Sequence, residues 1–271
     1  MSQSKVTDML LYPIKGCRGY SVEQVVVTPM GLLGDREFAL VKDGERANQK
    51  QLPDLIHLTA VWKSPDCLVM KYPSCEDFEL DCSLQQELAI GQIQVYGKDV
   101  PTLDMGNAVA EWLSKAFNAD VRLAKTNGPF DWFLPLPEFS LVHGEPQTKF
   151  VDAAPLLLTN AVSLTDLNSR LEEDLPMNRF RPNIVVDGLE PYYEDELASF
   201  NFPNVSLARV TVCERCIVTT TNQETGERKK EPLRALSKYR KRENDYAGGI
   251  LFGIYLTATS SGELAIGDNL E

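Results

Sequence analysis

The chain has 271 residues, enough for one large domain or two of modest size. Apolar residues make up 43% and charged residues 24%, as in folded globular proteins, and no apolar run reaches the roughly 18 residues of a membrane span. The formal net charge of -12 excludes a general nucleic-acid-binding surface, which needs a broad basic face, but leaves room for a local basic pocket.

The beginning of the chain, MSQSKVTDML, lacks the basic and apolar regions of a secretory signal, so a cytosolic protein is expected. The six cysteines are then expected to be reduced thiols, because disulfide frameworks are typical of small exported proteins.

The first part of the chain is predicted to form short strands. Apolar and β-branched residues cover 22–28, a Pro-Met-Gly turn follows, and a second run covers 36–42 before Asp43-Gly44. Short strands separated by turns indicate a β-barrel or a sandwich.

A helix is predicted near 107–117, and a domain boundary is expected after it. Four apolar side chains there recur at the spacing of one buried helix face: Val109, Trp112, Leu113 and Ala116. Placing the boundary near residue 122 gives domains of residues 1–122 and 123–271.

The second part mixes strands with short helices. Four prolines within 128–147 predict a long loop or a strand-edge segment. A helix is expected over 161–171, capped by Thr159 or Asn160. Strands are predicted in NIVVDG, VSLARVTV and CIVTTT, and Pro232 suits the first position of another helix.

Cys213 and Cys216 form a C-x-x-C pair that spacing alone leaves open. A thioredoxin-like role requires a helix after the pair, whereas IVTTT predicts a strand. A structural zinc site requires two more ligands, and the two histidines, His57 and His143, are isolated. One thiolate could instead bind a soft metal held mainly by a cofactor, favoured by the adjacent Arg215 and the basic run. Two ordinary half-buried cysteines explain the spacing equally well.

Eight Lys or Arg residues lie between Arg228 and Arg242. On a helix such a run is most often a solvated face, although in an acidic protein it can also receive a phosphate or an acidic partner. Lys15 in YPIKGCRG and Arg36 after Gly34-Asp35 are further candidates for anion binding. Arg179 and Arg181 in NRFRPN complete this group.

Taken together, these stretches resemble the MOSC family, in the branch with an N-terminal β-barrel domain that includes YcbX-type proteins and amidoxime-reducing components. The resemblance covers almost the whole chain. It rests on the order and spacing of LLYPIKGCRG, GLLGDREFALV, PLLLTNAVSLTDLNSRL, FRPNIVVDG and CERCIVTTTNQETG.

The resemblance implies a β-rich, mixed α+β fold, with an N-terminal β-barrel-like domain packed on a MOSC β-barrel that carries peripheral helices. It also implies a molybdenum cofactor in the cleft between them. The second cysteine of the motif, Cys216, would be the metal ligand and the catalytic residue, and Cys213 a neighbour. By motif match the cofactor-binding residues would be Lys15, Gly16, Arg36, Arg181 and Asn183, with Thr159, Asn160 and Ser163 as weaker candidates.

Two departures from the family pattern concern the cofactor site. Relatives usually have Ser where this chain has Gly16, so one hydroxyl contact would be missing. Many have Ala-Arg-Gln where this chain reads Ala47-Asn48-Gln49, which puts details of binding, but not the fold, in doubt.

The implied reaction is the reduction of amidoximes, hydroxylamines and N-hydroxylated bases, with the cofactor carrying the chemistry. The remaining cysteines, Cys17, Cys67, Cys75 and Cys82, lack the spacing of a plant-type iron–sulfur cluster, so none is expected in this chain. Electrons would come from a ferredoxin-like or flavoprotein partner, or from an iron–sulfur domain like that which follows this point in some relatives. No nucleic-acid or membrane partner is expected.

The competing interpretation is a non-redox carrier that holds the cofactor or passes sulfur through Cys216. Pyridoxal phosphate is also associated with the wider family, and Lys15 would be the residue to test for it.

Overall fold

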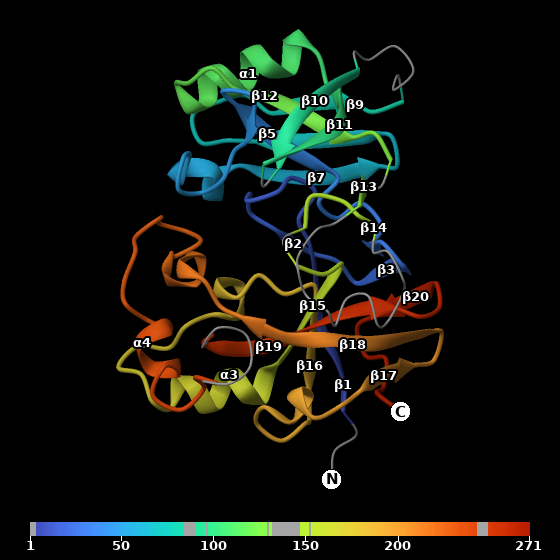
Figure 1. Ribbon diagram of the computed structural model, residues 1–271, viewed down its shortest axis with the longest axis vertical. Helices are drawn as coiled ribbons and strands as arrows, with labels where there is room; N and C mark the ends of the chain where they lie inside the picture. The colour runs from blue at the N-terminus through green and yellow to red at the C-terminus, as the bar shows by residue number, and fades with distance from the viewer. Residues whose placement is uncertain are drawn as a thin grey trace.

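The structure is a computed structural model, and it describes residues 4–83, 90–95, 97–128, 130–131, 147–151, 153–242 and 249–271. The chain forms two stacked halves (Figure 1), an upper one built around a barrel and a lower one built around a large sheet. Both chain termini lie at the lower half.

The upper half contains a closed five-stranded barrel and a three-stranded sheet. The barrel strands are β10 (Ile90–Val95), β11 (Lys98–Asp104), β12 (Arg122–Thr126), β5 (Phe38–Lys42) and β6 (Glu45–Arg46). The small sheet consists of β7 (Thr59–Ser64), β8 (Cys67–Lys71) and β9 (Phe78–Asp81). Helix α1 (Asn107–Phe117) packs its apolar face, with Val109 and Leu113 buried, on the core of this half. The helix predicted over 107–117 is thereby confirmed.

The lower half is a seven-stranded sheet with a three-stranded sheet beside it. In order across the large sheet, the strands are β17 (Ser199–Phe202), β18 (Val205–Glu214), β19 (Leu251–Ala258), β15 (Leu156–Asn160), β16 (Ile184–Asp187), β1 (Lys5–Leu11) and β2 (Tyr20–Ser21). The small sheet consists of β20 (Gly262–Ala265), β3 (Gln24–Thr28) and β4 (Gly31–Leu32). The β-rich, mixed fold expected from the sequence is confirmed.

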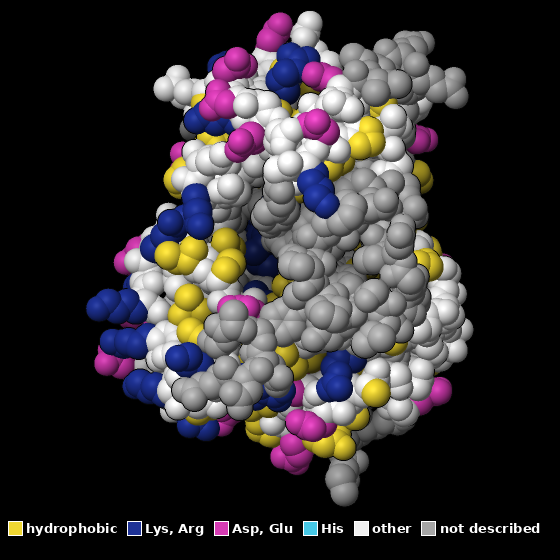
Figure 2. Space-filling view, viewed as in Figure 1, with side chains coloured by type: hydrophobic (Ala, Val, Ile, Leu, Met, Phe, Trp, Pro, Cys, Tyr) yellow, Lys and Arg dark blue, Asp and Glu magenta, His cyan; other side chains and the backbone are white. Residues whose placement is uncertain are grey.

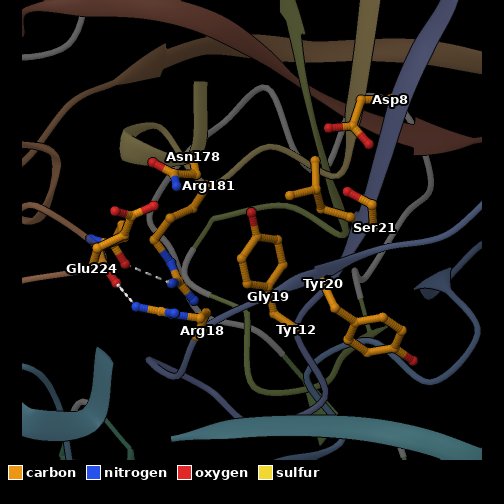
Figure 3. A pocket seen from close by; sticks show the side chains of 11 residues that line it. Asp8, Tyr12, Arg18, Gly19, Tyr20, Ser21, Asn178, Arg181 and Glu224 are labelled. Atoms are coloured by element: carbon orange, nitrogen blue, oxygen red, sulfur yellow. Dashed lines mark hydrogen bonds between the residues drawn. The ribbon is translucent and has the colours of Figure 1, made fainter. Parts of the chain in front are cut away.

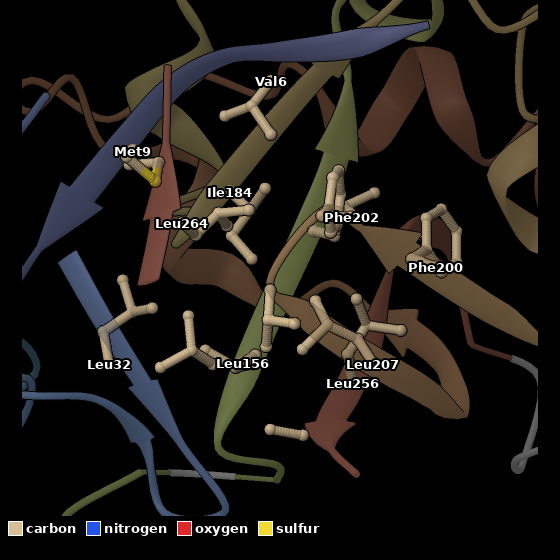
Figure 4. Close-up of a cluster of buried hydrophobic side chains, with 14 of the residues drawn as sticks. Val6, Met9, Leu32, Leu156, Ile184, Phe200, Phe202, Leu207, Leu256 and Leu264 are labelled. Atoms are coloured by element: carbon tan, nitrogen blue, oxygen red, sulfur yellow. The ribbon is translucent and has the colours of Figure 1, made fainter. Parts of the chain in front are cut away.

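The first strands of the chain belong to the lower half. Strand β1 pairs antiparallel with β16, in a register that places Met9 opposite Ile184. Val6 and Met9 pack with Leu32, Leu156 and other buried side chains in one core (Figure 4). The chain therefore starts in the lower half, crosses to build the upper half, and returns. The predicted boundary near residue 122 falls at the start of β12, a barrel strand, and the division into two domains there stays a prediction.

The remaining elements are short. Strands β13 (Phe130–Asp131) and β14 (Gln147–Thr148) pair at the two ends of the proline-rich stretch, whose residues 132–146, with His143, lie outside the described residues. The helices of the lower half are α3 (Ala161–Asn168) and α4 (Leu233–Leu236), with 3-10 helices η3 (Met177–Arg179), η4 (Tyr193–Asp195) and η5 (Ile217–Thr220); η1 (Pro53–His57) is in the upper half.

Two predicted elements differ in the structure. Helix α3 ends at Asn168, three residues before the predicted end, and continues as a turn. The segment after Cys216 is the 3-10 helix η5 and not a strand. The hydroxyl groups of Thr219 and Thr220 donate to the carbonyl oxygens of Cys216 (2.9 Å) and Ile217 (2.7 Å), local bonds that replace a sheet ladder.

Candidate functional site

The two cysteines of the C-x-x-C pair have different environments. Cys213 is fully buried near the end of β18, and burial raises the pKa of its thiol. Cys216 is exposed and directly precedes η5. Only Cys216 is therefore open to a ligand from outside, and Cys213 is its neighbour in the turn.

The side chain of Arg215 contacts Cys213, the buried cysteine of the pair. Its Nη1 donates to Cys213 Sγ at 2.7 Å, and its Nη2 donates to the carbonyl oxygen of Phe180 at 2.6 Å. Arg215 is thus hydrogen-bonded to Cys213, and the expectation that Arg215 and the basic run favour a thiolate ligand stays a prediction. Because β18 still pairs with β19 at Glu214, the Arg215 side chain points back into the protein beside Phe180.

The segment 179–181 holds the turn that carries Cys216. Arg179 is 3% exposed, and it donates from Nε to Thr219 O (2.9 Å) and from Nη2 to Thr220 O (2.8 Å). These bonds satisfy carbonyl groups of η5 that have no partner within so short a helix. Together with the bond from Arg215 to Phe180, they fix the chain on both sides of Cys216.

A buried ionic cluster joins residues from distant parts of the sequence. Asp35, 3% exposed, pairs with Arg36 and accepts from Tyr12 N (2.7 Å) and Asn183 Nδ2 (3.0 Å). Arg36 Nη1 also donates to Asn183 Oδ1 at 3.0 Å. The predicted residues Arg36 and Asn183 therefore lie together, and Asp35 neutralises the guanidinium that burial would otherwise disfavour.

Tyr12 is the aromatic centre of this cluster. The guanidinium carbons of Arg36 and Arg181 each lie 4.4 Å from its ring centroid. Both arginines have a left-handed backbone, with φ of 47° and 55°, which costs free energy in residues other than glycine and is frequent at functional sites. Burial raises the pKa of Tyr12 to about 12 and lowers that of Arg181. The Tyr12 hydroxyl is buried and has no hydrogen-bond partner among the residues that the structure describes.

A cavity of about 340 Å³ adjoins Tyr12 (Figure 3). Arg18 and Arg181 line it and share Gln223: Arg18 Nη2 donates to Gln223 O (2.6 Å), and Arg181 Nη1 donates to Gln223 Oε1 (3.3 Å). The other polar lining side chains are Asp8, Tyr20, Ser21, Asn178 and Glu224. The two guanidinium groups offer donors to an anionic group of a polar ligand, and the Asp8 and Glu224 carboxylates balance their charge in the same lining.

The segment of Lys15 and Gly16 is hydrogen-bonded to the upper half. The Lys15 amide donates to Phe38 O at 2.8 Å, and Gly16 O accepts from Gln49 Nε2 at 2.8 Å. Gly16 has φ +83°, a conformation that favours glycine over residues with a side chain. Gln49 O in turn accepts from Arg228 Nη2 at 3.0 Å, so this segment reaches the basic run of the lower half. Figure 2 shows a hollow between the halves in which Lys or Arg side chains are visible.

The weaker candidates make their hydrogen bonds at the start of α3. Asn160 caps the helix by accepting from Val162 N (3.0 Å), as predicted, and its amide donates to Glu190 O (3.0 Å). Ser163 Oγ donates to the Glu194 carboxylate at 2.9 Å. Thr159 Oγ is buried and has no hydrogen-bond partner within the described part of the chain. A role for these three residues in cofactor binding stays a prediction.

The buried Glu194 carboxylate should make stability depend on pH. Burial raises the pKa of Glu194 above its usual 4.5, so the folded state binds the proton more tightly than the unfolded state. The contribution of Glu194 to stability should therefore fall as pH rises above about 4.5, by up to about 1.4 kcal/mol per pH unit, until its folded-state pKa is passed. Glu194→Gln, which cannot titrate, should not show this loss.

Urea unfolding of both proteins between pH 4 and pH 8 measures this difference. The advantage of Glu194→Gln should grow with pH, whereas the exposed Glu190→Gln should follow the wild type throughout. Parallel curves for Glu194→Gln and the wild type would contradict the prediction.

Sequence reasoning missed Tyr12, Arg18, Asp35 and Gln223. Tyr12 is the first residue of the YPIKG motif and Arg18 lies two residues after its end, so both could have been proposed from it, and Asp35 directly precedes Arg36. For Gln223 no local signal exists, because its role depends on the path of the chain after η5. Among the described residues, no group of three or more His, Cys, Asp or Glu side chains could hold a metal ion, and no helix is long and apolar enough to cross a membrane.

Comparison with known proteins assigns both the first and the second part of the sequence to known domains. Residues 3–120 match the MOSC N-terminal beta barrel domain, and residues 145–271 match the MOSC domain. Mitochondrial amidoxime reducing component 2 of Bos taurus is 32% identical over 97% of this chain and 81% of its own length. Component 1 is 31% identical in Homo sapiens (97% and 81%) and 32% identical in Danio rerio (97% and 83%). The chain belongs to the MOSC family, with a MOSC N-terminal β-barrel domain followed by a MOSC domain.

Proposed function

We propose that this protein is a molybdenum-cofactor-dependent reductase of N-hydroxylated compounds. The observation that carries the proposal is its similarity, over 97% of the chain, to proteins named amidoxime-reducing components, which supports an N-reductive function of this MOSC chain. The exposed thiol of Cys216, in a turn held on both sides, is the second support.

The residues present fit the proposed cofactor. Cys216 offers a thiolate, the ligand that soft metal centres bind, and its backbone is held by Arg179 and Arg215. Arg18 and Arg181 would hold the phosphate end, and the unpartnered hydroxyl of Tyr12 beside them would gain the hydrogen bond that it lacks. Lys15, Gly16, Arg36 and Asn183 are further contacts implied by the family pattern.

When bound, the cofactor supplies two-electron chemistry: two electrons and two protons convert an N–OH group into N–H and release water. The contribution of the chain is to bind and orient. Arg36 and Arg181 are fixed by the cluster around Tyr12, so the cations are in place before a ligand arrives, which lowers the entropic cost of binding. A separate iron–sulfur or flavin protein would supply the electrons.

The test compares protein made in a host that synthesises molybdenum cofactor with protein made in a host whose synthesis is blocked. Molybdenum and pterin should be present near one per chain in the first and absent in the second. With reduced methyl viologen as electron donor, only the loaded protein should reduce benzamidoxime and hydroxylaminopurine. Full loading without turnover would favour the alternative carrier role, and no loading in the competent host would contradict both.

A further inference from the structure

Positive charge is concentrated in one short segment of this acidic protein. Residues 228–242 hold eight Lys or Arg and one Glu, a net charge of +7. Since the whole chain carries -12, the rest of the protein carries -19. A polyanion such as nucleic acid would meet repulsion outside this segment, so the charge distribution favours a compact partner with a local acidic patch.

Several of these cations are exposed. The side chains of Lys230, Lys238 and Lys241 are exposed and make no ion pair within the described ranges. Arg234 is 60% exposed, although it pairs with Glu231. We call these four side chains the basic face. Figure 2 shows Lys and Arg side chains gathered along the side of the lower half where Figure 1 places α4, the helix within this segment. The basic face is thus available to a partner.

The basic face lies next to the exposed cysteine. Helix α4 packs against η5, which starts immediately after Cys216. The first residues of the basic segment pair with the end of η5: Lys229 N donates to Thr220 O at 3.1 Å, and Arg228 forms a β-bridge with Thr221. Ile217, beside Cys216, is 47% exposed and is one of few large apolar side chains on the described surface. An apolar contact beside Cys216 and a basic rim are therefore contiguous.

We infer that the basic face, with Ile217 at its edge, docks an acidic electron-carrier protein and brings its redox centre close to Cys216. This inference rests on the proposed function. Transient electron-transfer complexes use small interfaces, and complementary charge speeds their formation more than it tightens them. When the carrier dissociates, the free-energy cost at the lysines is small, because each side chain returns to water. Dissociation can then be fast, which allows rapid exchange of the carrier.

The test reverses the charge of the basic face and compares a control of equal charge change in the upper half, where Lys63 and Lys71 pair with the exposed Glu79 and Asp77. The triple variant Lys230→Glu, Lys238→Glu, Lys241→Glu is set beside Lys63→Glu, Lys71→Glu, Lys115→Glu, whose exposed lysines lie in the upper half. Both change the net charge equally. Each cofactor-loaded protein is assayed for benzamidoxime reduction with a plant-type ferredoxin and its reductase, and separately with reduced methyl viologen.

With ferredoxin, kcat/KM of the basic-face variant should fall by about 10- to 100-fold at low salt, whereas that of the control variant should stay near wild type. With viologen, all three proteins should agree within about twofold. Raising the salt concentration should slow the ferredoxin-driven wild type and leave the basic-face variant little changed. Equal slowing of both variants, or a wild type insensitive to salt, would overturn the inference.

Direct binding of ferredoxin separates this inference from the proposed function. If no protein turns over even with viologen, the proposed function fails, and docking is then judged by ferredoxin binding alone, which only the basic-face variant should lose. Absence of ferredoxin binding by the wild type at low salt would overturn docking. Binding of phosphatidylserine vesicles in its place would assign the basic face to a membrane surface.

Discussion

Replacing Cys216 with serine is expected to lower the rate of benzamidoxime reduction by at least about 1000-fold and to leave the fold intact. A thiolate is the protein ligand that a soft metal centre prefers, and a serine hydroxyl stays protonated and binds such a centre poorly. Because Cys216 is exposed, the change should alter the free energy of unfolding by no more than about 0.5 kcal/mol.

Three measurements check this expectation: steady-state rates with reduced methyl viologen, molybdenum content, and X-ray absorption at the molybdenum edge. The variant should lose one sulfur ligand or lose metal. Cys75→Ser, at a half-buried free cysteine, is the matched control and should keep rate and metal. Cys213→Ala should keep one more sulfur ligand than Cys216→Ser and lose stability, because Arg215 Nη1 loses its acceptor. A Cys216→Ser protein with wild-type rate would remove this residue from the site.

Asp35→Asn is expected to destabilise the protein by about 3–5 kcal/mol, because it removes one partner of a buried ion pair and leaves the charge of Arg36 uncompensated. The Asp35 carboxylate also accepts hydrogen bonds from Tyr12 N and Asn183 Nδ2. The NH2 group of an asparagine side chain at position 35 would therefore face another donor. The midpoint of thermal unfolding should fall by about 10 °C. Urea unfolding measures the free energy, and cofactor content should fall in parallel as Tyr12 and Arg36 lose their fixed positions.

Two controls separate the buried charge from a general effect of removing carboxylates. Glu79→Gln breaks an exposed ion pair with Lys63, whose side chain is 59% exposed, and should leave the unfolding midpoint unchanged. The double variant Asp35→Asn, Arg36→Met should recover part of the lost stability, because the charge of Arg36 is then no longer buried without its partner. If the double variant were less stable than Asp35→Asn by as much as Arg36→Met alone is less stable than the wild type, the unpaired charge could not be the cause.

Much of the fold could be predicted from local sequence patterns. The spacing of Val109, Trp112, Leu113 and Ala116 placed α1 at its observed bounds, because a helix buries one face at a fixed period whatever it packs against. The strands of VSLARVTV and NIVVDG, and the Asn160 cap of α3, were likewise local. The motif around Cys216 and the order of segments indicated the MOSC family, which the matches over residues 3–120 and 145–271 confirm. The cytosolic location stays a prediction.

By itself, then, the sequence indicated the family, several local elements and Cys216 as the candidate metal ligand, because these depend on residue type and spacing. The tertiary structure alone decided which residues meet. The pairing of β1 with β16 brings Tyr12 to Arg181 and Asn183. The buried Arg179 bonds carbonyl oxygens of the 3-10 helix after Cys216, in addition to the local hydroxyl bonds of Thr219 and Thr220. Contacts between residues far apart in the chain depend on how whole strands pack, and no window of local sequence contains that information.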